Sequence, residues 1–221
     1  MWSDKRLVFV LLTIALALGT DLVAWALHGG WIAAALITFA LNALIVYHTW
    51  KTRDGLFGRL YLFGLLVGFG ELPTDYLAVS VQQTLVYAPG EPFIWDSPFY
   101  MPFSWALIMF QFGYLAYWMA NRWGLWRASL LTGVFGAINL PTYEFIAKQA
   151  GYWYYKDCWM VFFDSTPVYV IVGEFLLTVT LPFIVGRVVQ SHIPAIVAWA
   201  VGQSVWMYLA TRLAYAWVGQ R

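Results

Sequence analysis

Long apolar segments separated by short polar connections dominate the chain from end to end. A helix needs about 20 apolar residues to cross the hydrocarbon core of a bilayer. Seven segments reach this length, and we predict a membrane-spanning helix in each: 7–28, 31–49, 60–81, 99–121, 128–149, 167–187 and 195–217. The connections leave no room for a separate soluble module, so residues 1–221 are predicted to form one transmembrane domain, an all-α, polytopic helical bundle.

The middle four predicted helices contain an internal repeat. Shifting the chain by 68 residues aligns a copy at about 59–121 with a copy at about 127–187, with nine identities in the first 40 positions, which is above chance. The matches include Arg59 with Arg127, Leu72-Pro73-Thr74 with Leu140-Pro141-Thr142, and Asp96-Ser97 with Asp164-Ser165. Because each copy holds two spans, the copies share one orientation and form a tandem parallel two-helix repeat.

Composition supports a membrane location. Apolar residues make up 62% of the chain and charged residues 10%, whereas soluble domains carry about 25% charged residues. The formal net charge of +1 argues against a nucleic-acid partner. Cys158 is the only cysteine, and His28, His48 and His192 lack the spacing of metal ligands. We therefore expect no internal disulfide, no metal and no cofactor.

The basic residues are distributed unevenly between the two ends of the predicted bundle. One end has four basic residues: Lys148, Lys156, Arg212 and Arg221. The other end has eight: Lys5, Arg6, Lys51, Arg53, Arg59, Arg122, Arg127 and Arg187. Cytoplasmic loops of membrane proteins are enriched in lysine and arginine. The distribution therefore predicts a cytoplasmic N-terminus and an external C-terminus, with the two longest connections, 82–98 and 150–166, on the outer face.

Five acidic residues interrupt the apolar segments: Asp21, Glu71, Asp75, Glu144 and Glu174. Ionisable groups are costly inside a membrane and are functional-site candidates by default. Glu71 and Asp75 are four residues apart, so they share one helix face, and Pro73 between them predicts a kink that lines a cavity. Two carboxyl groups this close in a low dielectric do not both ionise, so one can serve as a general acid. The alternative is that the pair only ties helices together.

The second copy aligns different residues with these acids. This asymmetry predicts a site between the copies, with Glu144 and Glu174 as a second acid or a base. Asp21 lies outside the repeat and is interpreted as pairing with a neighbouring helix. Asn139 aligns with Glu71, Tyr143 with Asp75, and Glu144 with Tyr76. Asn139, Tyr143 and Tyr76 are accordingly candidates for substrate binding.

The two outer connections hold the remaining candidates. Asp96 precedes Ser97-Pro98, and Asp164 precedes Ser165-Thr166-Pro167. This pattern is typical of a helix N-cap with proline in the first turn, and the alternative is a substrate-binding position at the mouth of a cavity. The aromatic residues of these connections are interpreted as an interfacial belt, with substrate contact by Trp95 as the alternative: Trp95, Tyr87, Tyr155, Trp153 and Tyr154.

The sequence argues against several classes of membrane protein. It lacks a DDxxD-like cluster for magnesium and diphosphate, a lysine in the middle of a span for a retinal Schiff base, and a histidine cluster for a di-iron centre.

The remaining pattern resembles the small integral-membrane cyclases and hydratases of isoprenoid metabolism. These include meroterpenoid cyclases, two-part lycopene cyclases of carotenoid metabolism and bacterial carotenoid hydratases. The resemblance rests on topology, on Glu71 within Gly70-Glu71-Leu72-Pro73-Thr74-Asp75-Tyr76, and on Glu174 after Pro167-Val168-Tyr169. It implies a metal-independent enzyme that protonates an alkene or epoxide with membrane carboxyl groups.

Three functional hypotheses follow. The leading one is an enzyme that takes a lipid-soluble isoprenoid, a terpenoid or carotenoid, from the bilayer and cyclises or hydrates it. Glu71 or Asp75 would protonate the substrate, and Glu144 or Glu174 would remove or relay a proton. The alternatives are a proton-coupled transporter that uses the same carboxyl groups, and a non-catalytic protein that binds a lipid or pigment.

Overall fold

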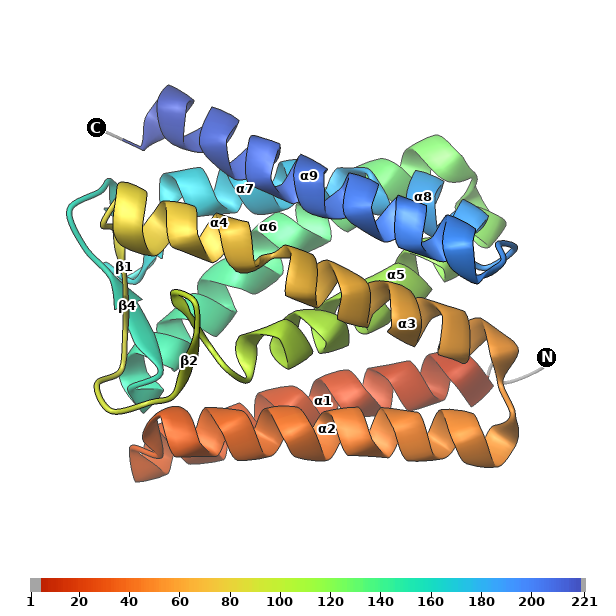
Figure 1. The fold of residues 1–221 in the computed structure, drawn as a ribbon, viewed down its shortest axis with the longest axis horizontal. Coiled ribbons are helices and arrows are strands. Elements are labelled where there is room, and N and C mark those ends of the chain that lie inside the picture. The colour runs from red at the N-terminus through yellow and green to blue at the C-terminus, as the bar shows by residue number, and fades with distance from the viewer. Residues whose placement is uncertain (1–4, 220–221) are drawn as a thin grey trace.

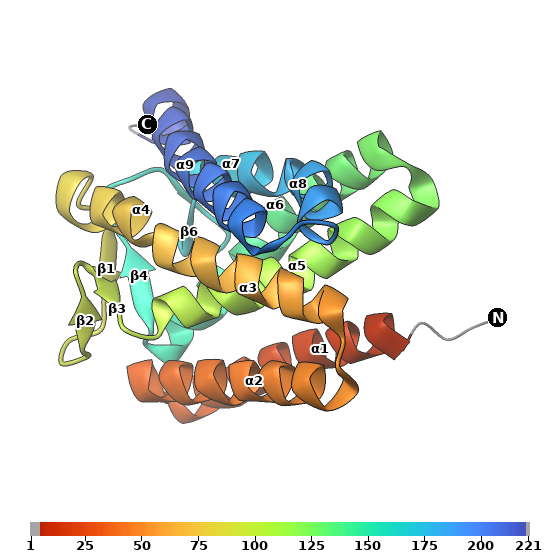
Figure 2. The same ribbon diagram turned by 45° about the vertical axis from the view of Figure 1, so that its right-hand side comes forward.

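The computed structural model describes residues 5–219, which form a bundle of long helices lying side by side (Figures 1 and 2). The helices are α1 (Lys5–Leu27), α2 (Gly30–Thr52), α3 (Gly55–Gly70), α4 (Leu72–Tyr76), the π-helix η1 (Leu77–Val81), α5 (Met101–Trp123), α6 (Leu125–Ala150), α7 (Val168–Val179), α8 (Leu181–Val188) and α9 (Ile193–Val218). The predicted all-α polytopic bundle is confirmed.

Six helical stretches within the described residues are long and apolar enough to cross a membrane: α1, α2, Gly55–Val81, α6, Val168–Val188 and α9. The seventh, α5, has 23 residues but includes buried polar side chains such as Ser104 and Gln111. It is enclosed by α1, α2, α3, α6 and α8, which pack against it. The mean hydropathy of α5 therefore underestimates its ability to cross a membrane, because its polar groups face protein instead of lipid. The fold is that of a multi-pass membrane protein.

Three short strand pairs join the helices at one end of the bundle (Figure 1). They are β1 (Leu85–Tyr87) with β4 (Trp153–Tyr155), β2 (Phe93–Ile94) with β3 (Ser97–Pro98), and β5 (Met160–Val161) with β6 (Thr166–Pro167), all antiparallel. All three belong to the two longest connections, whose backbone groups would otherwise lack partners where the chain leaves the helices.

The two halves of the middle region repeat the same order of elements, as predicted. A helix, a strand, a two-stranded hairpin and a second helix occur as α3–η1, β1, β2–β3 and α5, and again as α6, β4, β5–β6 and α7–α8. The copies meet at the β1–β4 pair, where Val86 lies opposite Tyr154, the residue 68 positions later. Each copy thus contributes one strand to a pair with approximate twofold symmetry.

Glycine allows the helices of each copy to cross closely. A Cβ atom on Gly68 would overlap the backbone carbonyl of Pro102 on α5, and one on Gly64 would lie 2.8 Å from the carbonyl oxygen of Ala106. In the second copy, a Cβ atom on Gly136 would overlap the side chain of Thr178. Small residues at helix crossings let backbones approach within a membrane, where packing replaces hydrophobic association. The crossings hold the two helices of each copy close together.

The two copies differ at their prolines. In the first copy the helix is interrupted at Glu71 and restarts as α4 with Pro73 in its first turn. In the second copy α6 is continuous, with Pro141 inside it. Proline removes a backbone hydrogen bond in both places, but only the first copy breaks. The predicted break near the acidic pair is therefore present, and it places Glu71 at a helix junction.

Glu91 in the connection between β1 and β2 is a buried acid outside the spans. Its side chain is 6% exposed, and both carboxyl oxygens lack a well-formed hydrogen bond within the described residues. Burial raises the pKa of Glu91 to about 7, although the Tyr100 hydroxyl and the Ala88 amide oppose this shift. The folded protein therefore keeps this proton at pH values where the unfolded chain has released it.

The expected consequence is a loss of stability as the pH rises from about 4.5 to about 7, followed by a plateau. Glu91→Gln removes this titration. Between pH 5 and pH 8, the free energy of unfolding of the variant should therefore fall less than that of the wild type, by on the order of 2 kcal/mol. Unfolding in detergent at the two pH values measures the difference. Asp157→Asn, at an exposed site in the other connection, should not reproduce it, and an identical pH dependence in Glu91→Gln and wild type would refute the assignment.

Candidate functional site

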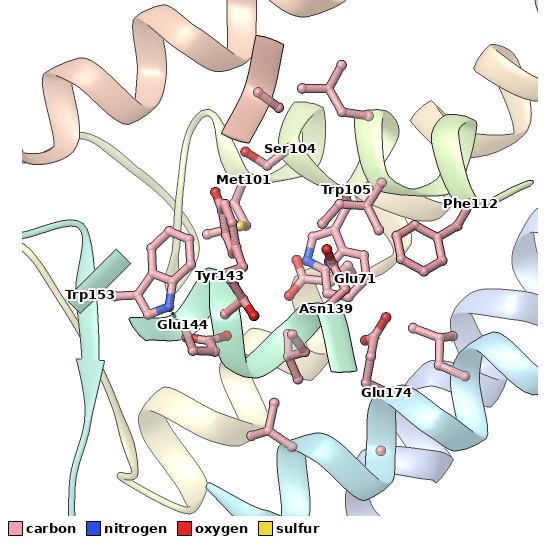
Figure 3. Close-up of a pocket in the computed structure, with 18 of the residues that line it drawn as sticks. Glu71, Met101, Ser104, Trp105, Phe112, Asn139, Tyr143, Glu144, Trp153 and Glu174 are labelled. Atoms are coloured by element: carbon pink, nitrogen blue, oxygen red, sulfur yellow. Dashed lines mark hydrogen bonds between the residues drawn. The ribbon is translucent and has the colours of Figure 1, made fainter. Parts of the chain in front are cut away.

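A cavity of about 430 Å³ lies inside the bundle (Figure 3). All five acidic residues of the apolar segments line it, and each is between 1% and 9% exposed. They are Asp21 on α1, Glu71 at the α3–α4 junction, Asp75 on α4, Glu144 on α6 and Glu174 on α7. Figure 3 shows Glu71, Glu144 and Glu174 around one hollow. The structure thus brings together all four residues predicted as catalytic.

Glu71 and Asp75 form a carboxyl pair in the cavity wall. Their side chains are close enough to hydrogen-bond each other, and the Trp105 indole contacts Glu71. A hydrogen bond between two carboxyl groups requires that one of them carries a proton. Asp75 Oδ2 accepts hydrogen bonds from the Tyr87 and Ser97 hydroxyls, each at 2.5 Å. Because such donors stabilise a carboxylate, the shared proton belongs on Glu71, whose Oε2 has no other partner.

Glu144 has a similar environment in the second copy. Its Oε2 accepts a hydrogen bond from the Trp153 indole at 2.7 Å, and its Oε1 accepts one from the Tyr155 hydroxyl at 3.4 Å. Burial and then the neighbouring carboxyl groups raise the pKa of Tyr87 and of Tyr155 well above the usual range, so both phenols remain donors at neutral pH. Each copy therefore supplies one tyrosine, at equivalent positions, to hold one cavity acid.

The acids held by these tyrosines occupy non-equivalent positions in the two copies. Asp75 aligns with Tyr143, and Glu144 aligns with Tyr76. Tyr143 also lines the cavity, whereas Tyr76 is 39% exposed on the outside and stacks on Trp95. Positions 71 and 139 and positions 75 and 143 line the cavity in both copies, so the copies differ at position 144, which lines the cavity while its equivalent, 76, does not.

Glu174 and Asp21 complete the ring of acids. Within residues 5–219, no group donates a hydrogen bond to the Glu174 carboxyl, which faces the cavity at 9% exposure. Asp21 accepts a hydrogen bond from the Tyr152 hydroxyl at 3.1 Å. The prediction that Asp21 pairs with a neighbouring helix is wrong, because its partner Tyr152 lies in the connection between α6 and β4. Glu174 is the acid with the least support from the protein.

The predicted substrate-binding residues divide into two groups. Asn139 and Tyr143 line the cavity together with the acids. Four others lie outside it: Tyr76, Trp95, Asp96 and Asp164. Trp95 is 57% exposed at the tip of the β2–β3 hairpin, and the Asp164 side chain is 82% exposed beside Lys148. These four residues are not placed to contact a molecule in the cavity.

The prediction that Asp96 and Asp164 cap helices is wrong. Asp96 lies in the turn between β2 and β3, where it accepts a hydrogen bond from Ser80 at 2.5 Å, and α5 begins later, with Tyr100 at its N-cap. Asp164 lies before β6 with a positive φ of 55°, and Pro167 is the N-cap of α7. The Asp-Ser pair is used in both copies to form a hairpin turn, which favours the same residue types as a cap.

The aromatic residues of the connections were only partly predicted. Tyr87, Trp153 and Tyr155 line the cavity and donate hydrogen bonds to its acids, so their interpretation as belt residues is wrong. Tyr154 is 47% exposed and fits a belt position. The alternation of side chains along a strand explains the difference, because residues 153 and 155 share one face of β4 and residue 154 the other. That alternation was the available signal in the sequence.

The described residues contain no group of three or more His, Cys, Asp or Glu side chains arranged to hold a metal ion. The five cavity acids are instead held separately or in one pair. The arrangement supplies a proton donor, four further carboxyl groups and hydrogen-bonding aromatic residues within an apolar cavity. Such a set suits proton transfer to or from a lipid-soluble molecule.

Comparison with known proteins places this chain in a family without assigning a function. No curated protein and no solved structure matches the chain. The matched family covers α4 to α9 and so includes Asp75, Glu144 and Glu174, whereas Asp21 and Glu71 precede the match. The chain belongs to the family described as a domain of unknown function, DUF6989, whose model matches residues 72–218.

Proposed function

We propose that the chain is an integral-membrane enzyme that protonates a lipid-soluble isoprenoid and so starts its cyclisation or hydration. The observation that carries this proposal is the contact between Glu71 and Asp75 in the wall of a largely apolar cavity. Asp75 is held by two hydroxyl donors, which leaves the proton on Glu71, whose side chain lines the space that a substrate would occupy. The isoprenoid class follows from the sequence resemblance alone.

In the proposed step, Glu71 transfers its proton to one carbon of a carbon–carbon double bond. The π electrons form the new C–H bond, Glu71 becomes a carboxylate, and the other carbon becomes a cation. The transfer leaves Glu71 and Asp75 as two adjacent carboxylates, and the substrate cation and the Trp105 indole offset their repulsion. The step needs no metal or redox partner, since electrons and charge balance between the acid and the substrate.

The cation then requires stabilisation and a base. Aromatic faces stabilise cations by about 0.5–2 kcal/mol each when desolvated, and rings surround the cavity: Trp105, Phe112, Tyr143, Trp153 and Tyr169. The ionised form of Glu174, which no donor within residues 5–219 stabilises, is a strong base and can accept a proton, either from a carbon next to the cation or from a water molecule that attacks it. Glu144 is the second carboxyl group available for this step, although Trp153 and Tyr155 already hold it.

We also propose that the N-terminus is cytoplasmic and the C-terminus external. The two ends of the chain lie at opposite ends of the bundle (Figure 1). The end near the start of α1 gathers the ends or beginnings of helices that carry Lys51, Arg59, Arg122, Arg127 and Arg187. The positive-inside rule assigns this end to the cytoplasm, and the strand pairs then lie outside.

Solvent extraction of lipids tests the enzymatic proposal. Cells with the gene should contain an isoprenoid that is absent from, or reduced in, cells without it, and cells that express a Glu71→Gln/Asp75→Asn double variant should match cells without the gene. An identical lipid profile in all three would argue against an enzyme. Uptake of a labelled solute into vesicles, driven by a pH gradient, would in that case favour the transporter hypothesis.

A further inference from the structure

We propose that the cavity opens sideways into the bilayer between α1 and α6, and that this portal admits a long-chain lipid that carries an oxygen function. This inference rests on the proposed function for its substrate but concerns the route of entry and the recognised group. Three apolar side chains both line the cavity and are exposed on the outer surface: Leu18 at 45%, Phe135 at 58% and Ile138 at 66%. A residue can do both only at an opening.

The opening lies within the depth of the membrane. Leu18 is in the second half of α1, and Phe135 and Ile138 are near the middle of α6, both of which are helices long and apolar enough to span a bilayer. Closer to the strand end, α1 and α6 are held together, because Tyr152, which follows α6, hydrogen-bonds to Asp21 and Phe145 packs edge-on against Trp25. The portal therefore faces lipid chains instead of water.

Asn139 marks the inner edge of this portal. It lines the cavity next to Ile138 and is exposed, and no group within residues 5–219 hydrogen-bonds its side-chain amide. An unpaired amide at membrane depth is costly. Thr132, on the same helix, avoids this cost by bonding to the carbonyl of Ala128. The amide of Asn139 is therefore available to a polar atom that comes from outside the protein.

These features define the class of ligand. The rim is apolar and continuous with the bilayer, so the ligand enters as part of the lipid phase. The amide just inside the rim binds one oxygen function, such as a hydroxyl or carbonyl, because it offers both a donor and an acceptor. The remaining chain of the ligand lies against the apolar walls near Glu71 or extends back into the lipid.

Dicyclohexylcarbodiimide provides a test that does not depend on enzymatic activity. This lipid-soluble reagent modifies protonated carboxyl groups, and carboxyl groups inside a membrane favour the protonated form. In phosphatidylcholine nanodiscs it should label Glu174, the cavity acid without a donor, as mapped by mass spectrometry. Ile138→Trp and, from the opposite side, Leu18→Trp should slow labelling at least tenfold. Leu131→Trp, on the same exposed face of α6 but outside the cavity lining, should leave it unchanged.

Equal labelling in all three tryptophan variants, or faster labelling by a water-soluble carbodiimide, would overturn the lateral portal.

The oxygen recognition is tested with hexadecanol and hexadecane as competitors. Hexadecanol should protect Glu174 better than hexadecane, and Asn139→Leu should remove the difference. Equal protection by alcohol and alkane in the wild type would refute the role of Asn139. A labelled but catalytically inactive wild type would instead count against the proposed function and leave the portal supported.

Discussion

Glu71→Gln is expected to lower product formation about 100-fold or more, the usual size of a general-acid contribution. Glutamine has nearly the same shape as glutamic acid but cannot transfer a proton to an alkene. Its amide can still hydrogen-bond to Asp75, so the α3–α4 junction is expected to keep its geometry. The measurement is the rate of isoprenoid product formation in isolated membranes, divided by the amount of folded protein. Asp75→Asn should lower the rate less, because asparagine still accepts the hydroxyl donors.

Glu91→Gln is the matched control for these variants. Glu91 is as buried as Asp75, with 6% and 7% exposure, but it does not line the cavity. The same change from acid to amide at Glu91 should leave product formation intact. Full activity in both Glu71→Gln and Asp75→Asn, with folded protein at the wild-type level, would show that the acidic pair is structural only.

Gly68→Ala is expected to reduce the free energy of unfolding by about 3 kcal/mol or more. The added methyl group would overlap the backbone carbonyl of Pro102, and a backbone atom in the middle of a packed helix pair cannot move aside without separating α3 from α5. Unfolding of the purified variant in detergent measures the loss.

The same substitution at two other glycines provides a comparison for this prediction. Gly19→Ala on α1 adds a methyl group that meets nothing within 4 Å, so stability should stay the same or rise by up to about 1 kcal/mol. Gly136→Ala is expected to cost less than Gly68→Ala, because the added methyl meets the side chain of Thr178, which can rotate. A Gly68→Ala variant as stable as Gly19→Ala would contradict the close crossing of α3 and α5.

The bundle and its repeat were predictable because both leave periodic signals in the sequence. The predicted spans 31–49 and 60–81 correspond to Gly30–Thr52 and Gly55–Val81, since the length of a span is fixed by the bilayer. The offset of 68 residues predicted the repeat of two helices, but it did not predict the β1–β4 pair, which joins the copies at equivalent positions. The buried acids were predicted by the high cost of charge inside a membrane.

The details of the site were less predictable because they depend on contacts between distant residues. Tyr87 and Tyr155 are ordinary belt residues by sequence, and only the pairing of β1 with β4 turns them toward Asp75 and Glu144. Asp96 has the sequence signature of a cap but lies in a hairpin turn. Both errors arise where short local patterns are shared by turns, caps and strands.

The alignment shows that the second acid is at Glu144 and not at Tyr143, but it could not show that Glu144 lines the cavity while its equivalent Tyr76 lies outside. Pro73 and Pro141 are equivalent in sequence, yet only the first copy breaks at its proline. The outcome is set by tertiary packing around each helix. The same packing turns a repeated framework into an asymmetric site.

Deuterium incorporation tests the central claim most directly. Membranes that contain the protein are incubated with the isoprenoid substrate in D₂O, and the product is analysed by mass spectrometry and NMR. Proton transfer from Glu71, which exchanges its proton with solvent between turnovers, predicts one deuterium on the carbon that receives the proton, and no labelled product from Glu71→Gln. A product that forms at the full rate without deuterium at any former alkene carbon would contradict acid-initiated chemistry in this cavity.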